Sequence, residues 1–228
     1  IFICGGAPVP YELMKAASEK MKYTTMVQGY GMTETSPIIS FLNLRHATQE
    51  KSSLAVLSTG KPLVGVETKL CNSNVDGVGE LAVRGPSIFS GYLNSSDESQ
   101  KLFENGWFRT GDMASFDDDG YIHIVDRKKD MIITGGENVY SKEVEDVLIK
   151  HPKINDVAVI GLPDEHWGER VVAVLVSKSK GIEDALQQHC ELYLGKYKIP
   201  KEWRFVDEIP KSALGKTLKN KLRELFVI

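Results

Sequence analysis

Two short apolar segments, each ending in a glycine turn, constrain the fold more than any other feature of this sequence. Residues 1–4 have the composition of a buried strand that runs into GGAP at residues 5–8, and residues 25–29 form a second strand that runs into Gly29-Tyr30-Gly31. Between them, residues 11–22 have helical periodicity. Strand, glycine turn and helix in succession favour α/β layering, which would put both glycine turns side by side at one edge of a parallel sheet.

The rest of the chain falls into two further regions. Residues 58–124 alternate short apolar pieces with Gly, Asn and Asp turns, which is typical of a small β barrel or sandwich. The stretch DRKKD at residues 126–130 is compact and charged, and we interpret it as a linker between two domains. We therefore predict a mixed α/β and α+β chain, with strand-turn-helix units and a small barrel over residues 1–125 and a small α/β domain over residues 131–228.

The second predicted domain has a complete pattern of its own. A hairpin at MIITGGENV precedes a helix from Ser141 to Lys150, for which Ser141 is the expected N-cap. Two strands are expected next, at residues 157–161 and 171–177. A helix from 182 to about 195 follows, then a strand at 203–206 and a tail after Pro210.

Composition excludes several classes of partner. The 228 residues carry a formal net charge of -3, so the chain lacks the basic footprint of a nucleic-acid binder. No apolar run approaches the roughly 20 residues that span a bilayer. Cys4, Cys71 and Cys190 lie far apart, which favours a reducing, cytoplasmic compartment over a disulfide framework. Because the chain opens on IFICGG without an initiator methionine, we expect a longer parent protein, in which an upstream targeting segment stays open.

The segment QGYGMTE places three kinds of ligand-binding group within one turn. Gly29 and Gly31 let the backbone come close to a ligand, and Tyr30 offers a flat face for a purine. Thr33 supplies a hydroxyl that suits a phosphate oxygen, and Glu34 supplies an oxygen ligand that suits magnesium. The alternative is an ordinary strand-to-helix turn with a capping threonine.

Two other acidic or glycine-bearing segments carry weaker signals. Asp112 ends the segment WFRTGD and can accept hydrogen bonds from both hydroxyls of a ribose, although an aspartate in a surface turn is the alternative. The GGAP turn is common before helices, and its value lies in its expected position beside the second glycine turn.

Basic residues suggest a moving part. Arg127 can hold a ribose or phosphate through its planar fork of donors, and Lys129 is a candidate hinge. Lys216 follows a glycine in the tail, where a mobile loop could bring its ammonium to a phosphate; a positioned cation of this kind is worth about 3–4 kcal/mol. The alternatives are a solvated charge run and a basic amphipathic tail.

Taken together, these segments resemble the adenylate-forming superfamily, which contains acyl- and aryl-CoA ligases, firefly luciferase and the adenylation domains of peptide synthetases. The matching segments run in the family's order across nearly the whole chain: GGAP, QGYGMTE, GELAVRGP, WFRTGD, GYIHIVDRKKDMIITGGENVYSKEVE, GLPDEHWGE and PKSALGK. The resemblance implies the C-terminal portion of a large AMP-binding domain, followed by a small mobile domain.

The resemblance also implies roles for individual residues in binding ATP and Mg²⁺. The glycine turn and Tyr30 would frame the adenine, Thr33 would contact the α-phosphate, and Glu34 would hold the magnesium ion. Asp112 and Arg127 would hold the ribose. The full set of implied nucleotide positions is Gly5, Gly6, Ala7, Gly29, Tyr30, Gly31, Met32, Thr33, Glu34, Asp112 and Arg127.

A second set of implied roles concerns motion and the acyl acceptor. Lys216 would contact the substrate carboxylate and the α-phosphate during adenylation, and Lys129 would be the hinge about which the small domain swings. That swing would withdraw Lys216 and bring Gly135 and Gly136 to the site, where they would form the tunnel for the CoA thiol.

One departure from the family's pattern limits what this chain is expected to do. The Ser/Thr/Gly-rich loop that cradles the β- and γ-phosphates is not found in these 228 residues, and in relatives it lies upstream. We therefore predict that the chain alone is inactive or weakly active.

The expected activity is ligation of a fatty or aryl acid to CoA through an acyl-adenylate, because DRKKDMIITGGENVYSKEVE resembles CoA ligases most. The expected partners are a small carboxylic acid and CoA. One alternative is transfer of the acyl group to the phosphopantetheine of a carrier protein, and another is a nucleotide-binding module without turnover. The five histidines show no metal-ligand spacing, and no oligomeric state is predicted.

Overall fold

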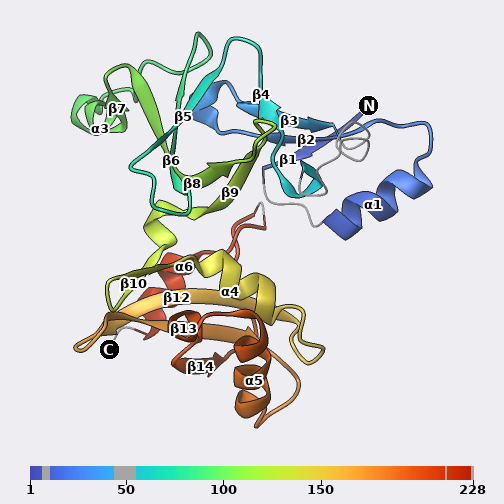
Figure 1. The fold of residues 1–228 in the computed structure, drawn as a ribbon, viewed down its shortest axis with the longest axis vertical. Helices are drawn as coiled ribbons and strands as arrows, with labels where there is room; N and C mark the ends of the chain where they lie inside the picture. Colours follow the sequence, from blue (N-terminus) through green and yellow to red (C-terminus); the bar gives the residue numbers. More distant parts are fainter. Residues whose placement is uncertain (7–10, 44–54, 214, 227–228) are drawn as a thin grey trace. The chain divides into compact units, whose positions relative to one another are not determined.

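A computed structural model describes residues 1–6, 11–43, 55–213 and 215–226. The chain divides into two compact units, which we call unit 1 (Ile1–Val125) and unit 2 (Asp126–Ile228) (Figure 1). Each unit is described by itself. The division falls directly before the charged stretch at residues 126–130, which belongs to unit 2.

The first sheet of unit 1 carries the two glycine turns. Its strand order is β1-β2-β3-β4, with bounds Phe2–Gly5, Met26–Tyr30, Ser40–Asn43 and Lys61–Pro62. Strands β1 and β2 are parallel and are joined through helix α1 (Tyr11–Lys20), and their register sets Gly5 opposite Gly29. The prediction that the two glycine turns lie side by side is therefore confirmed. The expected parallel sheet is instead mixed, because β2–β3 and β3–β4 are antiparallel.

Burial of the first strand was expected, and that expectation is wrong. Ile1, Phe2 and Ile3 are 89%, 46% and 58% exposed. The reason is topological: among the described residues, β1 is the edge strand of its sheet and pairs only with β2.

The second sheet of unit 1 has five strands and positions Asp112. The strands are β5 (Glu67–Cys71), β6 (Gly79–Arg84), β7 (Phe103–Glu104), β8 (Trp107–Phe116) and β9 (Ile122–Arg127), and β8 pairs with β6, β7 and β9. One short helix, α3 (Ser96–Leu102), precedes β7. The buried apolar side chains of this sheet, among them Leu81, Phe108 and Ile122, pack with Ile39 and with the partly buried Tyr30. That core holds the end of β2 against the second sheet.

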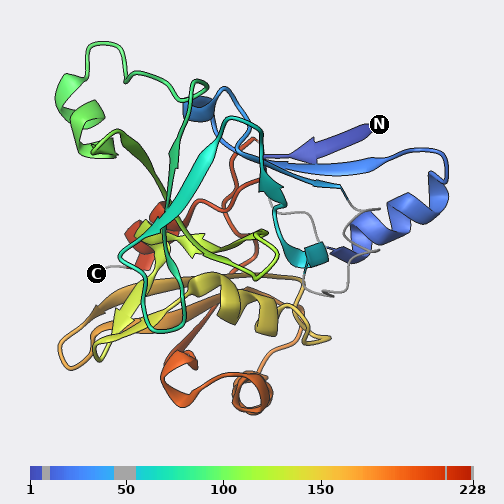
Figure 2. The ribbon, with the colours of Figure 1, turned by 45° about the horizontal axis from the view of Figure 1, so that its top comes forward.

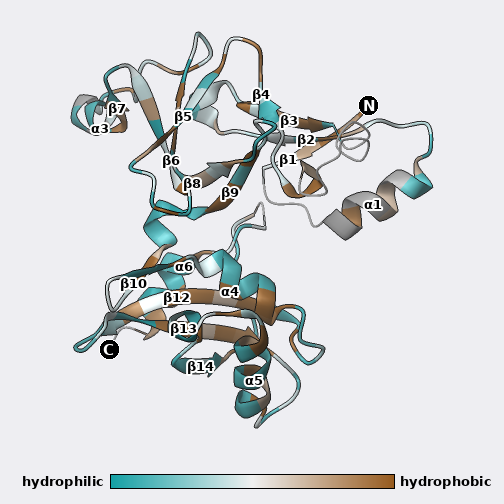
Figure 3. Ribbon diagram, in the orientation of Figure 1, coloured by the Kyte–Doolittle hydropathy of each residue, from teal (hydrophilic) through white to brown (hydrophobic). Residues whose placement is uncertain are grey.

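Unit 2 is one sheet with helices on both faces. Its strand order is β11-β10-β13-β12 with β14 beside β13, and the bounds are Ile132–Thr134 (β10), Glu137–Val139 (β11), Asp156–Asp164 (β12), Gly168–Val176 (β13) and Glu202–Phe205 (β14). The helices are α4 (Ser141–Leu148), α5 (Glu183–Tyr193) and α6 (Lys219–Phe226). The ribbon in Figure 3 shows that the central strands β12 and β13 are mainly hydrophobic.

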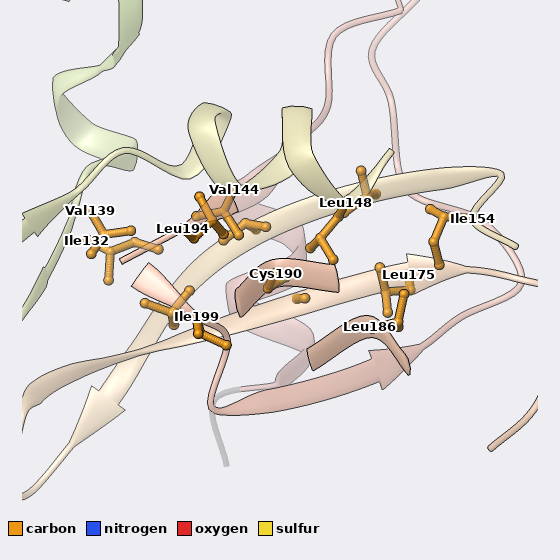
Figure 4. Packing of buried hydrophobic residues seen from close by; sticks show 14 of the residues in the cluster. Ile132, Val139, Val144, Leu148, Ile154, Leu175, Leu186, Cys190, Leu194 and Ile199 are labelled. Carbon is orange, nitrogen blue, oxygen red and sulfur yellow. The ribbon is translucent and has the colours of Figure 1, made fainter. Parts of the chain in front are cut away.

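Alternate residues of β12 and β13 feed two separate cores, because successive side chains of a strand point to opposite faces. Val157, Val159 and Leu175 join the core under α4 and α5, where Val144 and Leu148 lie above Leu186 and Cys190 (Figure 4). Ala158, Ile160 and Val174 join the core that contains Leu222 of α6. Figure 2 shows the ribbon from a second direction.

The start of α4 differs from the expected one. The N-cap residue is Tyr140, and Ser141 is the first helical residue. Ser141 does not cap the helix, because its Oγ donates a hydrogen bond to Asp126 Oδ2 at 2.6 Å. Asp126 supplies the cap instead, since the same oxygen accepts the Lys142 N–H at 3.2 Å. The helix ends at Leu148, two residues earlier than expected.

All three cysteines are free thiols. In the described part of the chain, no helix is both long enough and apolar enough to cross a bilayer.

Candidate functional site

Unit 1 brings together Tyr30 and Asp112, which are 82 residues apart. Tyr30, the last residue of β2, donates a hydrogen bond from Oη to Asp112 Oδ2 at 2.5 Å. Asp112 lies inside β8 and is only 2% exposed, so the alternative that it belongs to a surface turn is wrong. An aromatic face and a carboxylate thus meet at the edge where the glycine turns lie.

A bulge in β8 determines where Asp112 points. The register between β6 and β8 shifts between Glu80 and Ala82, and Gly111 has a φ of +72° inside the strand. A bulge of this kind bends the strand and re-aims the next side chain. Thr110 fixes the bulge, because its Oγ1 donates to the Leu81 carbonyl at 2.8 Å and accepts the Asp112 N–H at 3.2 Å.

Close backbone packing explains two of the glycines. A Cβ on Gly31 would lie 2.0 Å from the Pro37 carbonyl oxygen, and a Cβ on Gly5 would lie 2.5 Å from the Gly29 carbonyl oxygen. Both residues are therefore required by the chain's own backbone, whatever ligand they also meet. Gly6 is different, since its φ is +84° and the space around its position is open. Ala7 lies outside the described residues.

The turn after β2 presents Thr33 and Glu34. It is a short 3-10 helix, Thr33–Thr35, that starts after Met32. The buried Thr35, rather than Thr33, makes the capping contacts, because its Oγ1 accepts the Met32 N–H at 3.1 Å and donates to the Met32 carbonyl at 2.9 Å. The alternative that Thr33 is the capping threonine is wrong, and its side chain is exposed.

Tyr92 is a site residue that the sequence did not point to. Its Oη donates a hydrogen bond to Glu34 Oε1 at 2.6 Å, and the nearby Phe89 N–H donates to the Glu34 carbonyl at 2.9 Å. The rings of Phe89 and Tyr92 are in edge contact, with centroids 5.1 Å apart. Glu34 is therefore held from both its backbone and one carboxylate oxygen, which leaves Oε2 for another ligand.

This arrangement fits a magnesium ion that arrives with phosphates. Within the described ranges, no three His, Cys, Asp or Glu side chains gather as a metal site. Mg²⁺ is usually held by one or two carboxylates together with substrate phosphates and water, so a single fixed carboxylate is sufficient. Glu34 is the residue that would hold it.

The charged stretch at residues 126–130 is only partly solvated, which corrects the alternative of a plain solvated run. Arg127, Lys128 and Lys129 are exposed, whereas Asp130 is 8% exposed and pairs with Arg223 at 2.9 Å. Asp126 is fixed at the start of α4 by the bonds already described. The two aspartates thus anchor the stretch in unit 2, and the basic side chains lie between them.

Gly135 and Gly136 form the turn between β10 and β11. Their φ angles are +60° and +84°, which other residues rarely adopt. The Gly135 N–H donates to the Trp167 carbonyl at 2.8 Å, and a Cβ on Gly135 would lie 2.9 Å from the Trp167 ring. Trp167, which is 46% exposed, therefore packs directly on this glycine turn.

Lys216 is exposed and lies in a closed turn. The Ser212 N–H donates to the Lys216 carbonyl at 2.8 Å, and the Lys216 N–H donates to Ser212 Oγ at 3.2 Å. An isolated bridge joins Lys211 to Thr217 on either side. Of the positions named from the sequence, Tyr30, Glu34 and Asp112 belong to unit 1, whereas Arg127, Lys129, the glycine pair and Lys216 belong to unit 2.

Two family models match the chain. The model described as AMP-binding enzyme matches residues 1–93, and the model described as AMP-binding enzyme C-terminal domain matches residues 143–216. The first range includes Tyr30 and Glu34, and the second ends on Lys216.

Among characterised proteins, the chain is similar to the 2-succinylbenzoate–CoA ligase of Bacillus licheniformis. The two are 38% identical over 224 residues, which cover 96% of this chain and 45% of that ligase. The chain thus spans about half the length of the curated relatives it matches.

Solved structures give the same picture. The o-succinylbenzoate CoA synthetase from Bacillus subtilis, in complex with its acyl-adenylate intermediate, has a TM-score of 0.83 at 35% identity, covering 97% of this chain and 45% of that one. The same synthetase has been solved in complex with ATP and magnesium ion, with a TM-score of 0.81 at 35% identity, covering 96% and 45%. The amide bond synthetase McbA from Marinactinospora thermotolerans has a TM-score of 0.83 at 34% identity, covering 99% and 46%.

Proposed function

This chain belongs to the AMP-binding enzymes of the adenylate-forming superfamily, and we propose that it is the nucleotide-holding C-terminal part of an acid–CoA ligase. The observation that carries the proposal is the bond from Tyr30 to Asp112 beside the glycine edge of the first sheet. An aromatic face and a buried carboxylate there suit an adenine and its ribose hydroxyls. We call a natural chain of the relatives' length that contains these residues the full-length enzyme.

The first half-reaction is attack of a substrate carboxylate on the α-phosphate of ATP, with loss of pyrophosphate. Asp112 would accept hydrogen bonds from the ribose hydroxyls, Arg127 would donate hydrogen bonds to ribose oxygens, and Tyr30 would lie against the adenine. Lys216 would place its ammonium against the charge that develops on the α-phosphate oxygens. Magnesium, when bound at Glu34, would neutralise phosphate charge.

In the second half-reaction, the CoA thiolate attacks the acyl carbon of the mixed anhydride and AMP leaves. A lysine that remained beside the α-phosphate would obstruct the thiol, which is the reason to propose a rotation about Lys129. That rotation would withdraw Lys216 and present the turn at Gly135 and Gly136.

The decisive test is Lys216→Ala in the full-length enzyme. Pyrophosphate exchange should fall about 10²–10³-fold, because a positioned cation is lost. Thioester formation from supplied acyl-adenylate should stay near the wild-type rate. Equal losses in both steps would show that Lys216 is not specific to adenylation. Lys221→Ala, an exposed lysine of α6, is the matched control and should leave both steps unchanged.

The acid is proposed to be aromatic, because the matched ligases are named for 2-succinylbenzoate. A panel of aromatic and fatty acids, scored by AMP release, tests this. Aromatic acids should be turned over with the higher kcat/KM, and a preference for fatty acids would reverse the assignment. The three free thiols and the CoA chemistry support a cytoplasmic location, which fractionation of cells would check.

The acceptor is proposed to be CoA. The similarity to an amide bond synthetase gives a specific reason to test an amine, and a carrier-protein phosphopantetheine is the remaining alternative. Discharge of the full-length enzyme's adenylate should be fastest with CoA. Faster discharge by an amine or a carrier protein would keep the adenylation and change the second step.

We propose that the 228 residues alone bind nucleotide without useful turnover. Calorimetry with AMP should show binding that Asp112→Asn weakens, while pyrophosphate exchange stays at background. Exchange at a rate near that of the full-length enzyme would contradict this proposal.

A further inference from the structure

The first residue of α6, Lys219, carries a buried ammonium. It pairs with Glu145 Oε1 at 2.6 Å and donates to Ser141 Oγ at 2.6 Å, and the side chains of Lys219 and Glu145 are 10% and 15% exposed. The Val159 N–H of β12 donates to the same Glu145 oxygen at 2.9 Å. Burial raises the pKa of Glu145, and the Lys219 ammonium opposes that rise. The pair therefore joins α6 to α4 and to the central sheet.

The same cluster reaches the charged stretch at residues 126–130. Ser141 accepts from Lys219 and donates to Asp126, so one hydroxyl links a cation of α6 to a carboxylate of the stretch. Four residues further along α6, Arg223 pairs with Asp130 at 2.9 Å. Residues four apart share one face of a helix, so a single face of α6 is tied to both ends of the stretch.

Stability alone does not account for this polar face. Leu222, which is 1% exposed, and Phe226 lie next to these two charged residues on the same side of α6, and they already dock the helix. A buried ion pair roughly breaks even against apolar residues of similar volume, because desolvating two charges offsets their attraction. What such a pair adds is a fixed direction, and here it fixes how α6 is oriented relative to residues 126–130.

Lys216 lies three residues before Lys219. The turn that holds it is closed within itself by the bonds between Ser212 and Lys216, and it joins α6 through Leu218, whose N–H donates to the Pro210 carbonyl at 2.8 Å. The orientation of α6 therefore sets the direction from which the Lys216 ammonium approaches any ligand.

We propose that Lys219 and Arg223 are positioning residues for adenylation, which fix the Lys216 turn to the stretch at residues 126–130. The proposal rests on the proposed role of Lys216. A rotation that begins at residues 126–130 then moves α6 and the Lys216 turn together as one rigid body. The contribution is specific to the half-reaction in which Lys216 is at the α-phosphate, because thioester formation proceeds with that lysine withdrawn.

The test measures each half-reaction separately in the full-length enzyme. Lys219→Met should lower the kcat for pyrophosphate exchange about ten- to hundredfold, the loss that a misplacement of about 1 Å can cause. The KM for ATP should change less than threefold, since Lys219 contacts no proposed nucleotide position. Thioester formation from supplied acyl-adenylate should be unchanged. Lys219→Arg, which keeps the cation, should recover most of the exchange rate.

Folding is controlled with a second variant, because Lys219→Met leaves Glu145 buried without its cation. The double variant Lys219→Met, Glu145→Gln removes both charges and should unfold near the wild-type temperature while pyrophosphate exchange stays low. Lys221→Met is the matched control on the exposed side of the same helix and should behave as wild type.

The outcomes separate this proposal from the one on which it rests. If Lys216→Ala lowers exchange and the double variant does not, the positioning role is wrong and the function stands. If Lys216→Ala leaves exchange intact, the proposed function of the lysine is wrong. Equal losses in both half-reactions for a folded Lys219 variant would show a structural role only and would overturn the inference.

Discussion

The bulge at Gly111 determines the direction of the Asp112 carboxylate. A substitution there should therefore have one effect on stability and a second, separately measurable effect on AMP binding. Gly111→Ala should cost about 1–2 kcal/mol of unfolding free energy, because a Cβ is strained at a φ of +72° although the space around it is open. It should also weaken AMP binding by the full-length enzyme several-fold, since relaxing the bulge turns Asp112 away from Tyr30. Urea unfolding and calorimetry with AMP measure the two effects.

The matched control for that prediction is Gly77→Ala. Gly77 has a φ of +73° and equally open surroundings, and it lies in a turn remote in sequence from the site. It should lose the same stability and keep its AMP affinity. Equal losses of affinity in both variants would show that strain in general, rather than the aim of Asp112, lowers binding.

The titration of Asp117 makes the unfolding free energy of unit 1 depend on pH. Burial raises the pKa of Asp117, but hydrogen bonds from His123 and from the Tyr121 and Asp119 N–H groups outweigh it and hold the pKa below the ordinary 3.8. Because the folded-state pKa is depressed, the stabilisation is complete above the unfolded value and is lost as the pH falls through the lower folded value.

Asp117→Asn should therefore lower the unfolding free energy by about 1 kcal/mol at pH 7, and the difference should close as the pH falls below the ordinary 3.8. Urea unfolding across that range tests it. Asp118→Asn, at the exposed neighbouring position, is the control and should match wild type throughout. A deficit of constant size at every pH would contradict the titration.

At the scale of elements, Leu222 is the apolar side chain that contributes most to the packing of α6 on the sheet of unit 2. Leu222 is 1% exposed in the core with Ile160 and Val174, so Leu222→Ala should cost about 2–5 kcal/mol. Leu225, on the same helix and 64% exposed, is the matched control, and Leu225→Ala should cost less than about 0.5 kcal/mol. Thermal unfolding of the 228-residue chain measures both. Similar losses would mean that α6 docks by another face.

The elements also show how far sequence reasoning reaches. The adjacency of Gly5 and Gly29 was predictable, because strand order and parallel direction follow from local patterns. The bond from Tyr92 to Glu34 was not, since it joins residues 58 apart and a lone tyrosine carries no pattern. A solvated run was the alternative for the charged stretch because a charge run gives no sign of distant partners, yet Asp130 is held by Arg223, 93 residues later.

At the scale of the whole molecule, unit 2 should fold by itself. Its two cores use residues between Ile132 and Phe226, and its sheet is built from strands of unit 2 alone. Residues 126–228, expressed alone, should unfold in one cooperative transition, followed by the fluorescence of Trp167 and Trp203. A chain that lacks fixed tertiary structure would contradict the autonomy of the unit.

A shorter chain sharpens that test. Residues 131–228 lack both Asp126, which caps α4, and Asp130, which pairs with Arg223. Loss of a cap alone costs about 1 kcal/mol, which for a unit of this size lowers Tm by about 4–8 °C. An unchanged Tm would mean that the start of the small unit lies after the charged stretch rather than before it.

The position of Asp126 has a consequence for any motion at Lys129. Asp126 precedes that residue in the chain, whereas Ser141 and Lys142, its partners, follow it. A large backbone rotation at Lys129 must carry the partners away and break both bonds, while the pair of Asp130 with Arg223 travels unbroken. Under the proposed rotation at Lys129, Asp126 therefore favours the arrangement in which both bonds are formed, and Asp126→Ala should shift the equilibrium towards the other proposed arrangement.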